Sequence, residues 1–245
     1  MLQVDLHSHT LFSRCGLHTA MEMLNQAKAV GLKGLAITDH GLTLGGHLNG
    51  PFFNRLYDPV PGVKLFKGVE CNVLDDGGHI DLPMQWIQYL DVVLVGLHPN
   101  LKGILSRRHT TDMLVAALER NPYVDIVSHP NSPDFMVDFE QVAQAALKHG
   151  IALELNNSKS RPGYATDEVT LDLIKTCKEV GCTMAVSSDA HAITEVGDDS
   201  YVRGFLEDNE FPEELIVNRS LESTLAFIEQ RRQKRIETVE SYPVE

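Results

Sequence analysis

Short apolar segments alternate with longer amphipathic segments along most of the chain. Seven apolar segments have the length of buried strands, and they occupy residues 3–9, 34–40, 65–71, 91–98, 124–130, 151–157 and 183–191. Four segments between them repeat apolar residues at helical spacing, at 19–31, 110–121, 138–150 and 167–181, and three of these end at a glycine that suits a helix C terminus. This order predicts repeated strand–helix units around a parallel sheet or barrel.

Nothing in the pattern divides the chain into separate units. The 245 residues contain no low-complexity tract, internal repeat or linker-like run, so we expect one domain over 1–245. Residues 41–63 interrupt the alternation and predict a long, irregular loop with one helical turn. Long loops of this kind in compact domains are often functional.

The composition narrows the class of partner. The formal net charge is −13, which argues against stable nucleic-acid binding, because nucleic-acid surfaces depend on clustered Lys and Arg. No apolar run approaches the ~18 residues of a membrane span, and no signal-peptide pattern is present, so we expect a cytoplasmic protein with no membrane partner. The four cysteines form no C-x-x-C pair, which predicts reduced thiols.

Metal-binding residue types stand at the carboxyl ends of six of the seven predicted strands. They are His7 and His9 after the first strand, then His40, Glu70, His98 and His129 after the next four, and Asp189 and His191 after the seventh. An isolated H-x-H pair is more often a polar strand end that its neighbours satisfy. Here, however, six of the eleven histidines fall at equivalent positions, and the carboxyl ends of parallel strands in a barrel meet at one mouth. The pattern therefore predicts a metal site.

The types and number of candidate ligands restrict the kind of metal and the number of ions. Imidazoles with carboxylates suit Zn, Mn or Fe rather than a structural zinc site made only of thiolates. Eight candidate ligands exceed the ~4 to 6 that one ion takes, which predicts two or three ions with a carboxylate such as Glu70 between them. Clusters of this type carry out hydrolysis.

Six short motifs resemble, in order, the metal motifs of the PHP (polymerase and histidinol phosphatase) family, and most closely those of its YcdX-type phosphatase branch. The motifs are DLHSHT at 5–10, TDH at 38–40, GVE at 68–70, GLH at 96–98, SHP at 128–130 and SDAH at 188–191. The resemblance covers nearly the whole chain. It implies an α/β fold, a distorted seven-stranded (β/α)7 TIM-like barrel, with a trinuclear metal centre that commonly holds zinc.

Carried over residue by residue, the resemblance implies three ligand sets. One ion is held by His7, His9, Glu70 and Asp189, a second by His40 and His191, and a third by Glu70, His98 and His129.

The chain departs from the family at one position of the second set. Where the family supplies a further histidine, the aligned residue here is Cys15. A thiolate binds zinc well, so we expect Cys15 to complete the set, with His18, three residues on, as the alternative.

These features predict a metal-dependent phosphoesterase acting on small phosphomonoesters. Two ions ~3.5 to 4 Å apart can share and activate a hydroxide, and a third can bind phosphoryl oxygens. The expected catalytic residues are Glu70, Asp189 and His191, and the expected cofactor is zinc as three ions, with Mn or Fe as alternatives. Phosphodiesterase or exonuclease activity, amidohydrolase activity and a non-catalytic metal-storing role remain alternatives, and the sequence leaves a homo-oligomer open.

Basic residues near the strand ends are candidates for holding the phosphate of the substrate. Arg107 and Arg108 follow the fourth strand, beside Lys102 and His109, and we expect phosphate contact from one of the two arginines. Lys159 and Arg161, after the sixth strand, form a second candidate pair. The basic segment 230–235 near the end of the chain is expected to face solvent on a terminal helix.

Overall fold

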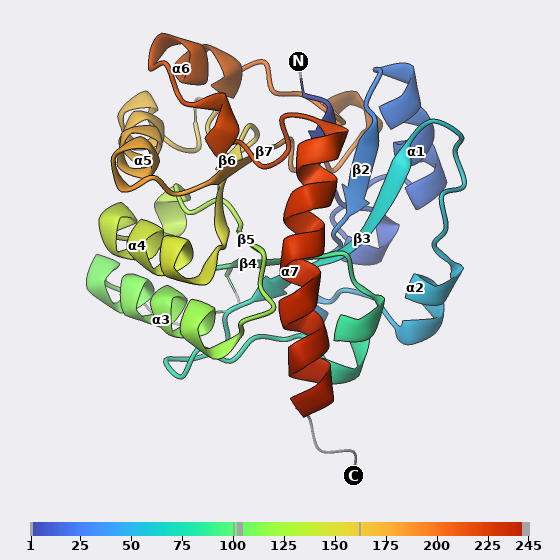
Figure 1. Ribbon diagram of the computed structural model, residues 1–245, viewed down its shortest axis with the longest axis horizontal. Helices are drawn as coiled ribbons and strands as arrows, with labels where there is room; N and C mark the ends of the chain where they lie inside the picture. Colours follow the sequence, from blue (N-terminus) through green and yellow to red (C-terminus); the bar gives the residue numbers. More distant parts are fainter. Residues whose placement is uncertain (1, 100, 102–104, 162, 242–245) are drawn as a thin grey trace.

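Seven parallel strands curve around a common axis in the order of the sequence (Figure 1). The computed structural model describes residues 2–99, 101, 105–161 and 163–241. The strands are β1 (Val4–Asp5), β2 (Gly34–Ile37), β3 (Lys64–Asn72), β4 (Val92–Gly96), β5 (Ile126–Val127), β6 (Ala152–Asn156) and β7 (Met184–Ser187). Each lies within or within one residue of a segment that the apolar pattern predicts.

The sheet closes on itself through a short contact between its first and last strands. Every consecutive pair from β1 to β7 is parallel. Beyond the ends of β1 and β7, Ser8 and Ala190 form a parallel bridge, in which the N–H of His9 donates to the carbonyl of Ala190 at 2.8 Å. The fold is therefore the predicted (β/α)7 TIM-like barrel.

Helices surround the barrel, and α3, α4 and α5 line one of its sides in Figure 1. The helices are α1 (Ala20–Ala29), α2 (Gly50–Arg55), α3 (Arg107–Arg120), α4 (Phe139–His149), α5 (Asp167–Val180), α6 (Val202–Asp208) and α7 (Leu221–Ser241). Short 3-10 turns complete the elements: η1 (Leu11–Ser13), η2 (Leu42–Leu44), η3 (Met84–Tyr89), η4 (Pro133–Phe135), η5 (Ile193–Glu195) and η6 (Glu213–Leu215). No helix in the described ranges is both long and apolar enough to cross a membrane.

Helix α3 begins three residues before its predicted segment. The reason is a cap: the Oγ of Ser106 accepts a hydrogen bond from the N–H of His109 at 3.2 Å, which satisfies a free donor of the first turn. The predicted loop 41–63 contains η2 and the short α2, and is otherwise irregular.

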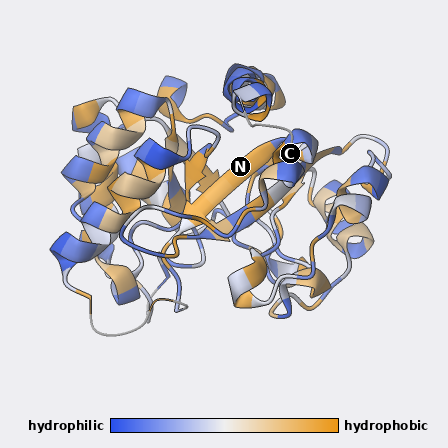
Figure 2. Cartoon of the chain, turned by 90° about the horizontal axis from the view of Figure 1, so that it is seen from below, coloured by the Kyte–Doolittle hydropathy of each residue, from blue (hydrophilic) through white to orange (hydrophobic). Residues whose placement is uncertain are grey.

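The strands separate two apolar cores, and Figure 2 shows the hydrophobic strands with helices of mixed hydropathy around them. The larger core lies between the strands and the surrounding helices. The smaller core fills the interior of the barrel, with residues such as Phe66, Leu94, Ile126 and Ala152. Along β3, Phe66 belongs to this inner core, and Glu70, four residues on and on the same face of the strand, is also fully buried. The interior thus changes from apolar to polar toward the carboxyl ends of the strands.

Helix α7 covers the amino-terminal end of the barrel and crosses its front in Figure 1. Two of its arginines are buried, against the expectation that the basic segment 230–235 faces solvent. Arg231 Nε lies 3.1 Å from Asp125 Oδ1 and Arg235 Nη1 lies 2.5 Å from Asp125 Oδ2. Arg231 also donates to the carbonyls of His149, Pro122 and Val124. These backbone carbonyls lie near the starts of strands and need hydrogen-bond donors when they are buried. Arg231 supplies those donors, which explains why its side chain is buried.

We expect the Arg231→Met variant to lower the free energy of unfolding by about 3 kcal/mol, because the change breaks a buried ion pair and removes donors from buried carbonyls. Arg232→Met is the matched control, since that side chain is 63% exposed on the same helix, and it should stay within about 0.5 kcal/mol. Urea unfolding of both variants measures the difference. Equal effects of the two changes would contradict a structural role for the buried arginine.

Candidate metal centre

The structure brings the eight predicted histidine and carboxylate ligands together at the carboxyl ends of the strands. This is the end of the barrel opposite α7. The ligand side chains are buried or nearly so, and they are His7, His9, His40, Glu70, His98, His129, Asp189 and His191. Six of them line a cavity of about 460 Å³, and His7 and His9 are fully buried beside them.

Four ligand atoms enclose a space of the size that a tetrahedral ion needs. His7 Nε2 lies 3.0 Å from His9 Nε2 and 3.5 Å from Asp189 Oδ1. His9 Nε2 lies 3.2 Å from the same carboxylate oxygen, and Glu70 Oε2 lies 3.4 Å from both imidazole nitrogens. Ligand atoms at ~2.0 to 2.1 Å from a tetrahedral zinc ion are ~3.3 Å apart. These four residues are the first ligand set that the resemblance implies.

Glu70 lies between this set and a second group of imidazoles. Its Oε2 faces His7 and His9, whereas its Oε1 lies 3.1 Å from His98 Nε2 and 2.8 Å from His129 Nε2. One carboxylate therefore presents a different oxygen to each group. A carboxylate that bridges two metal ions needs this arrangement.

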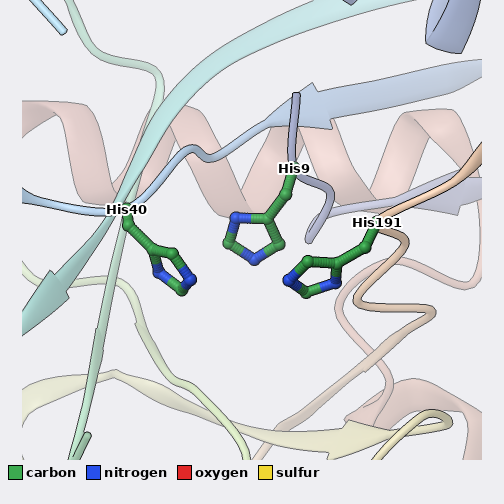
Figure 3. A group of neighbouring side chains, drawn as sticks. All are labelled: His9, His40 and His191. Atoms are coloured by element: carbon green, nitrogen blue, oxygen red, sulfur yellow. The ribbon is translucent and has the colours of Figure 1, made fainter. Parts of the chain in front are cut away.

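A third group of imidazoles faces the cavity beside the first. Figure 3 shows the rings of His9, His40 and His191 side by side, and the ring centres of His40 and His191 are 4.4 and 4.3 Å from that of His9. Ligand atoms of these three residues lie within 4.8 Å of one another. His191 Nδ1 lies 2.9 Å from the carbonyl of Asp189, so Nε2 is the nitrogen that would bind a metal.

The structure places Cys15, rather than His18, beside this third group. The Cys15 thiol lines the cavity and makes hydrogen bonds with His40 and His191. His18 does not line the cavity, and its Nδ1 accepts a hydrogen bond from the N–H of Ile193 at 3.3 Å. The geometry therefore favours Cys15 for the position where the family has a histidine.

The ligand side chains differ in their affinity for protons. Burial would lower the pKa of His40, but its contacts with Cys15 and Glu70 outweigh burial and raise that pKa to about 10, so a bound divalent ion would displace a proton there. Burial lowers the pKa of His9 to about 3, which leaves its imidazole neutral. Burial would raise the pKa of Glu70, but the facing imidazoles, His7 and His98 foremost, hold it well below its usual range. For Cys15, burial is likewise outweighed by hydrogen bonds from His191 and His40, and its pKa falls to about 6.

One contact supports the fit of these residues to a metal. His40 Nδ1 and Glu70 Oε2 are buried and only 2.8 Å apart, yet neither has a hydrogen-bond partner among the described residues. Buried polar atoms are almost always paired. A shared divalent ion would satisfy an imidazole nitrogen and a carboxylate oxygen that face one another in this way, and this donor set suits Zn, Mn or Fe.

Buried acids that the sequence analysis did not single out hold the ligand loops in place. Asp39 accepts hydrogen bonds from Thr10 and Ser13, and Ser13 Oγ lies 2.9 Å from His9 Nδ1. Asp5 accepts hydrogen bonds from Ser188 and from the N–H of Gly197. The signal that could have found them is an acid inside or directly after an apolar strand, because such an acid needs several donors when buried.

Two ligands have backbone conformations that L-residues rarely adopt. The φ angle is 30° at His129 and 55° at Asp189. Such conformations cost about 1–3 kcal/mol each and persist where the surroundings impose them, often at functional sites. Both lie directly after strands, where the chain turns its side chain into the mouth of the barrel.

The structure does not bring the predicted phosphate-binding arginines into the cavity. Arg107 Nε donates to the carbonyl of Val137, and the Arg108 side chain is 92% exposed beside Asp112. They begin α3, no residue of which is among those that line the cavity, and Lys102 of the same segment lies outside the described residues.

The cationic residues that line the cavity are Lys159 and Arg14. Lys159 Nζ lies 3.9 Å from Asp189 Oδ2, and the side chain is 30% exposed. Arg14 Nε donates to His47 Nε2 at 2.8 Å. Arg161, the partner of Lys159 in the sequence prediction, pairs instead with Asp198.

Comparison with known proteins gives consistent matches over nearly the whole chain. A family model described as PHP domain matches residues 5–128. A probable phosphatase of Caldicellulosiruptor saccharolyticus is 35% identical over 230 residues, which are 93% of this chain and 96% of the relative. A probable phosphatase of Shewanella sediminis is 35% identical over 243 residues, covering 96% of each chain.

A solved structure shares the fold. The crystal structure of the histidinol phosphate phosphatase of Lactococcus lactis, complexed with zinc, L-histidinol and phosphate, matches with a TM-score of 0.62. The sequence identity is 15%, and the match covers 86% of this chain and 94% of the other. Because the family model and the near-full-length relatives agree, the chain belongs to the PHP domain family, among its phosphatases.

Proposed function

We propose that this protein hydrolyses small phosphomonoesters with three metal ions, zinc in the first place and Mn or Fe as alternatives. The observation that carries this proposal is the position of Glu70, whose two oxygens face two separate groups of ligands. A single-ion site has no need for such a shared carboxylate.

The ligand sets are those that the family resemblance implies, and the short distances between their side chains support them. His7, His9, Glu70 and Asp189 would hold the first ion, His40 and His191 with Cys15 the second, and Glu70, His98 and His129 the third. Divalent ions held there would polarise the phosphoryl group and lower the pKa of the attacking water. We assign the catalytic roles to Glu70, Asp189 and His191, which fix the charge and the shape of the cavity floor.

Other residues of the cavity would bind the substrate. Lys159 stands where it can contact phosphoryl oxygens, because its ammonium group reaches the centre near Asp189 and is partly exposed. The cavity of about 460 Å³ suits a small molecule. The net charge of −13 disfavours a nucleic-acid substrate, so a phosphomonoester takes precedence over a phosphodiester.

The relatives support this choice of chemistry. Two proteins that match nearly the whole chain are named probable phosphatases, and the Lactococcus lactis protein acts on a small phosphorylated compound. Phosphodiester and amide hydrolysis remain the competing activities.

We expect the zinc-loaded protein to hydrolyse phosphomonoesters in a panel that also contains phosphodiesters and amides. A chelator should abolish the activity and added Zn or Mn should restore it, because the charge of the ions drives the chemistry. The panel assay measures the substrate preference, and elemental analysis of the same sample measures the metal content. A preference for diesters or amides, or less than one metal equivalent per chain, would contradict the proposal.

We expect Cys15 to resist alkylation in the zinc-loaded protein and to react after the metal is removed, because coordination occupies the thiolate. Cys71, Cys177 and Cys182 are buried, so the difference should equal one equivalent of label by mass spectrometry. His18→Ala is the control and should leave zinc binding unchanged. Equally fast labelling of Cys15 with and without zinc would show that the thiol is not a ligand.

We expect Lys159→Met to reduce kcat/KM for a phosphomonoester by about 10- to 100-fold, mostly through KM, since a hydrogen bond to a charged group is worth about 1.5–3 kcal/mol. Arg108→Met, which removes a fully solvated charge on α3, should stay within about twofold. Steady-state kinetics of the two variants decide between the two positions. A larger loss of kcat/KM in the Arg108 variant would show that α3, rather than Lys159, contacts the phosphate.

A further inference from the structure

Strand β6 differs from the other six strands because it ends without a metal ligand. Its residues Ala152, Glu154 and Asn156 share one face, and Ala152 belongs to the core inside the barrel. Glu154 and Asn156 are fully buried and contact the ligands that neighbouring elements supply. We propose that Glu154 is a positioning residue that fixes His7 and His129 for metal binding, with Asn156 extending its effect to Asp189. This inference rests on the proposed metal-dependent function.

The first contact orients the imidazole ring of His7. Glu154 Oε1 lies 2.7 Å from His7 Nδ1, and both side chains are 0% exposed. An ionised carboxylate can only accept hydrogen bonds, so Nδ1 must donate. The lone pair of a neutral His7 is then on Nε2, the atom that faces His9, Glu70 and Asp189 at 3.0 to 3.5 Å. Histidine ligands are commonly oriented in this way through their second nitrogen.

The second contact holds the backbone of another ligand. Glu154 Oε2 accepts the N–H of His129 at 2.7 Å, at the residue whose φ is 30°. This hydrogen bond opposes relaxation of the unfavourable backbone conformation. It thereby keeps His129 Nε2 at 2.8 Å from Glu70 Oε1. One carboxylate thus holds a ligand of the first set with one oxygen and a ligand of the third set with the other.

Asn156 continues the network to the last strand. Its Nδ2 donates to Glu154 Oε2 at 3.0 Å and to Asp189 Oδ2 at 3.2 Å. Because Oδ2 is engaged, Asp189 presents Oδ1 to His7 and His9. The two polar residues of β6 therefore orient ligands that come from β1, β5 and β7.

The Glu154→Gln variant tests the proposal with little change in shape. The His7 ring and the His129 N–H meet different oxygens of Glu154, and a carboxamide replaces one of these acceptors with an NH2 group that only donates, so one of the two contacts is lost. We expect zinc binding, measured by competition with a chelating dye, to weaken by about 10- to 100-fold. In the zinc-loaded wild type, ¹H–¹⁵N spectra should show a hydrogen-bonded Nδ1 proton on His7, and the variant should lose or shift it. Glu168→Gln, an exposed change on α5, is the matched control and should leave both readouts unaltered.

A purely structural role predicts a different outcome. The variant would then unfold more easily but retain wild-type zinc affinity and the same His7 signal, and this result would overturn the proposal. If the Glu154→Gln protein does not fold, Asn156→Ala replaces it and should weaken zinc binding through the released Asp189; unchanged affinity there would also overturn it. Zinc affinity is measured without any phosphate ester, so loss of the proposed phosphatase activity in the wild type is a separate result.

Discussion

The arrangement of the protein depends on the electrostatic constraint at Glu70, a fully buried carboxylate surrounded by imidazoles. Removing such a charge from water is costly unless opposite charges or hydrogen-bond donors surround it. Histidines from four different strand ends meet this need only if the strands end at the same level of the barrel. The sheet register, the bridge between Ser8 and Ala190 and the buried acids beneath the loops all serve to bring those ends to one level.

The residues that stabilise the barrel and the residues of the candidate site lie at opposite ends of its axis. On β3, Phe66 packs in the inner core and Glu70 lies at the metal centre, although the two residues share one face of one strand. The amino-terminal end is filled with apolar side chains and covered by α7. The strained backbone at His129 and Asp189 lies at the opposite end, where the rigid barrel below can support it.

Much of the fold and the convergence of the candidate ligands could be predicted from the sequence, because both depend on local patterns. Strand ends in parallel barrels share a mouth, so ligand residues after successive apolar segments need no further information to be placed together. Contacts between distant segments were not predictable in this way. The burial of Arg231 depends on Asp125, 106 residues earlier, and the direction of Arg107 depends on how α3 begins. Glu154 was missed because an acid in an apolar strand has no partner visible along the chain.

The contacts between α7 and the base of the barrel affect the order in which the chain folds. Arg231 and Arg235 reach Asp125 across 106 and 110 residues, and Arg235 also reaches the carbonyl of Asp91 across 144 residues. During synthesis, strands β1 to β7 emerge before these arginines, so Asp125 and the carbonyls around it stay hydrated until the final helix arrives. Contacts of such long range slow folding. Helix α7 thus excludes water from the base of the barrel, and it follows all the candidate metal ligands in the chain.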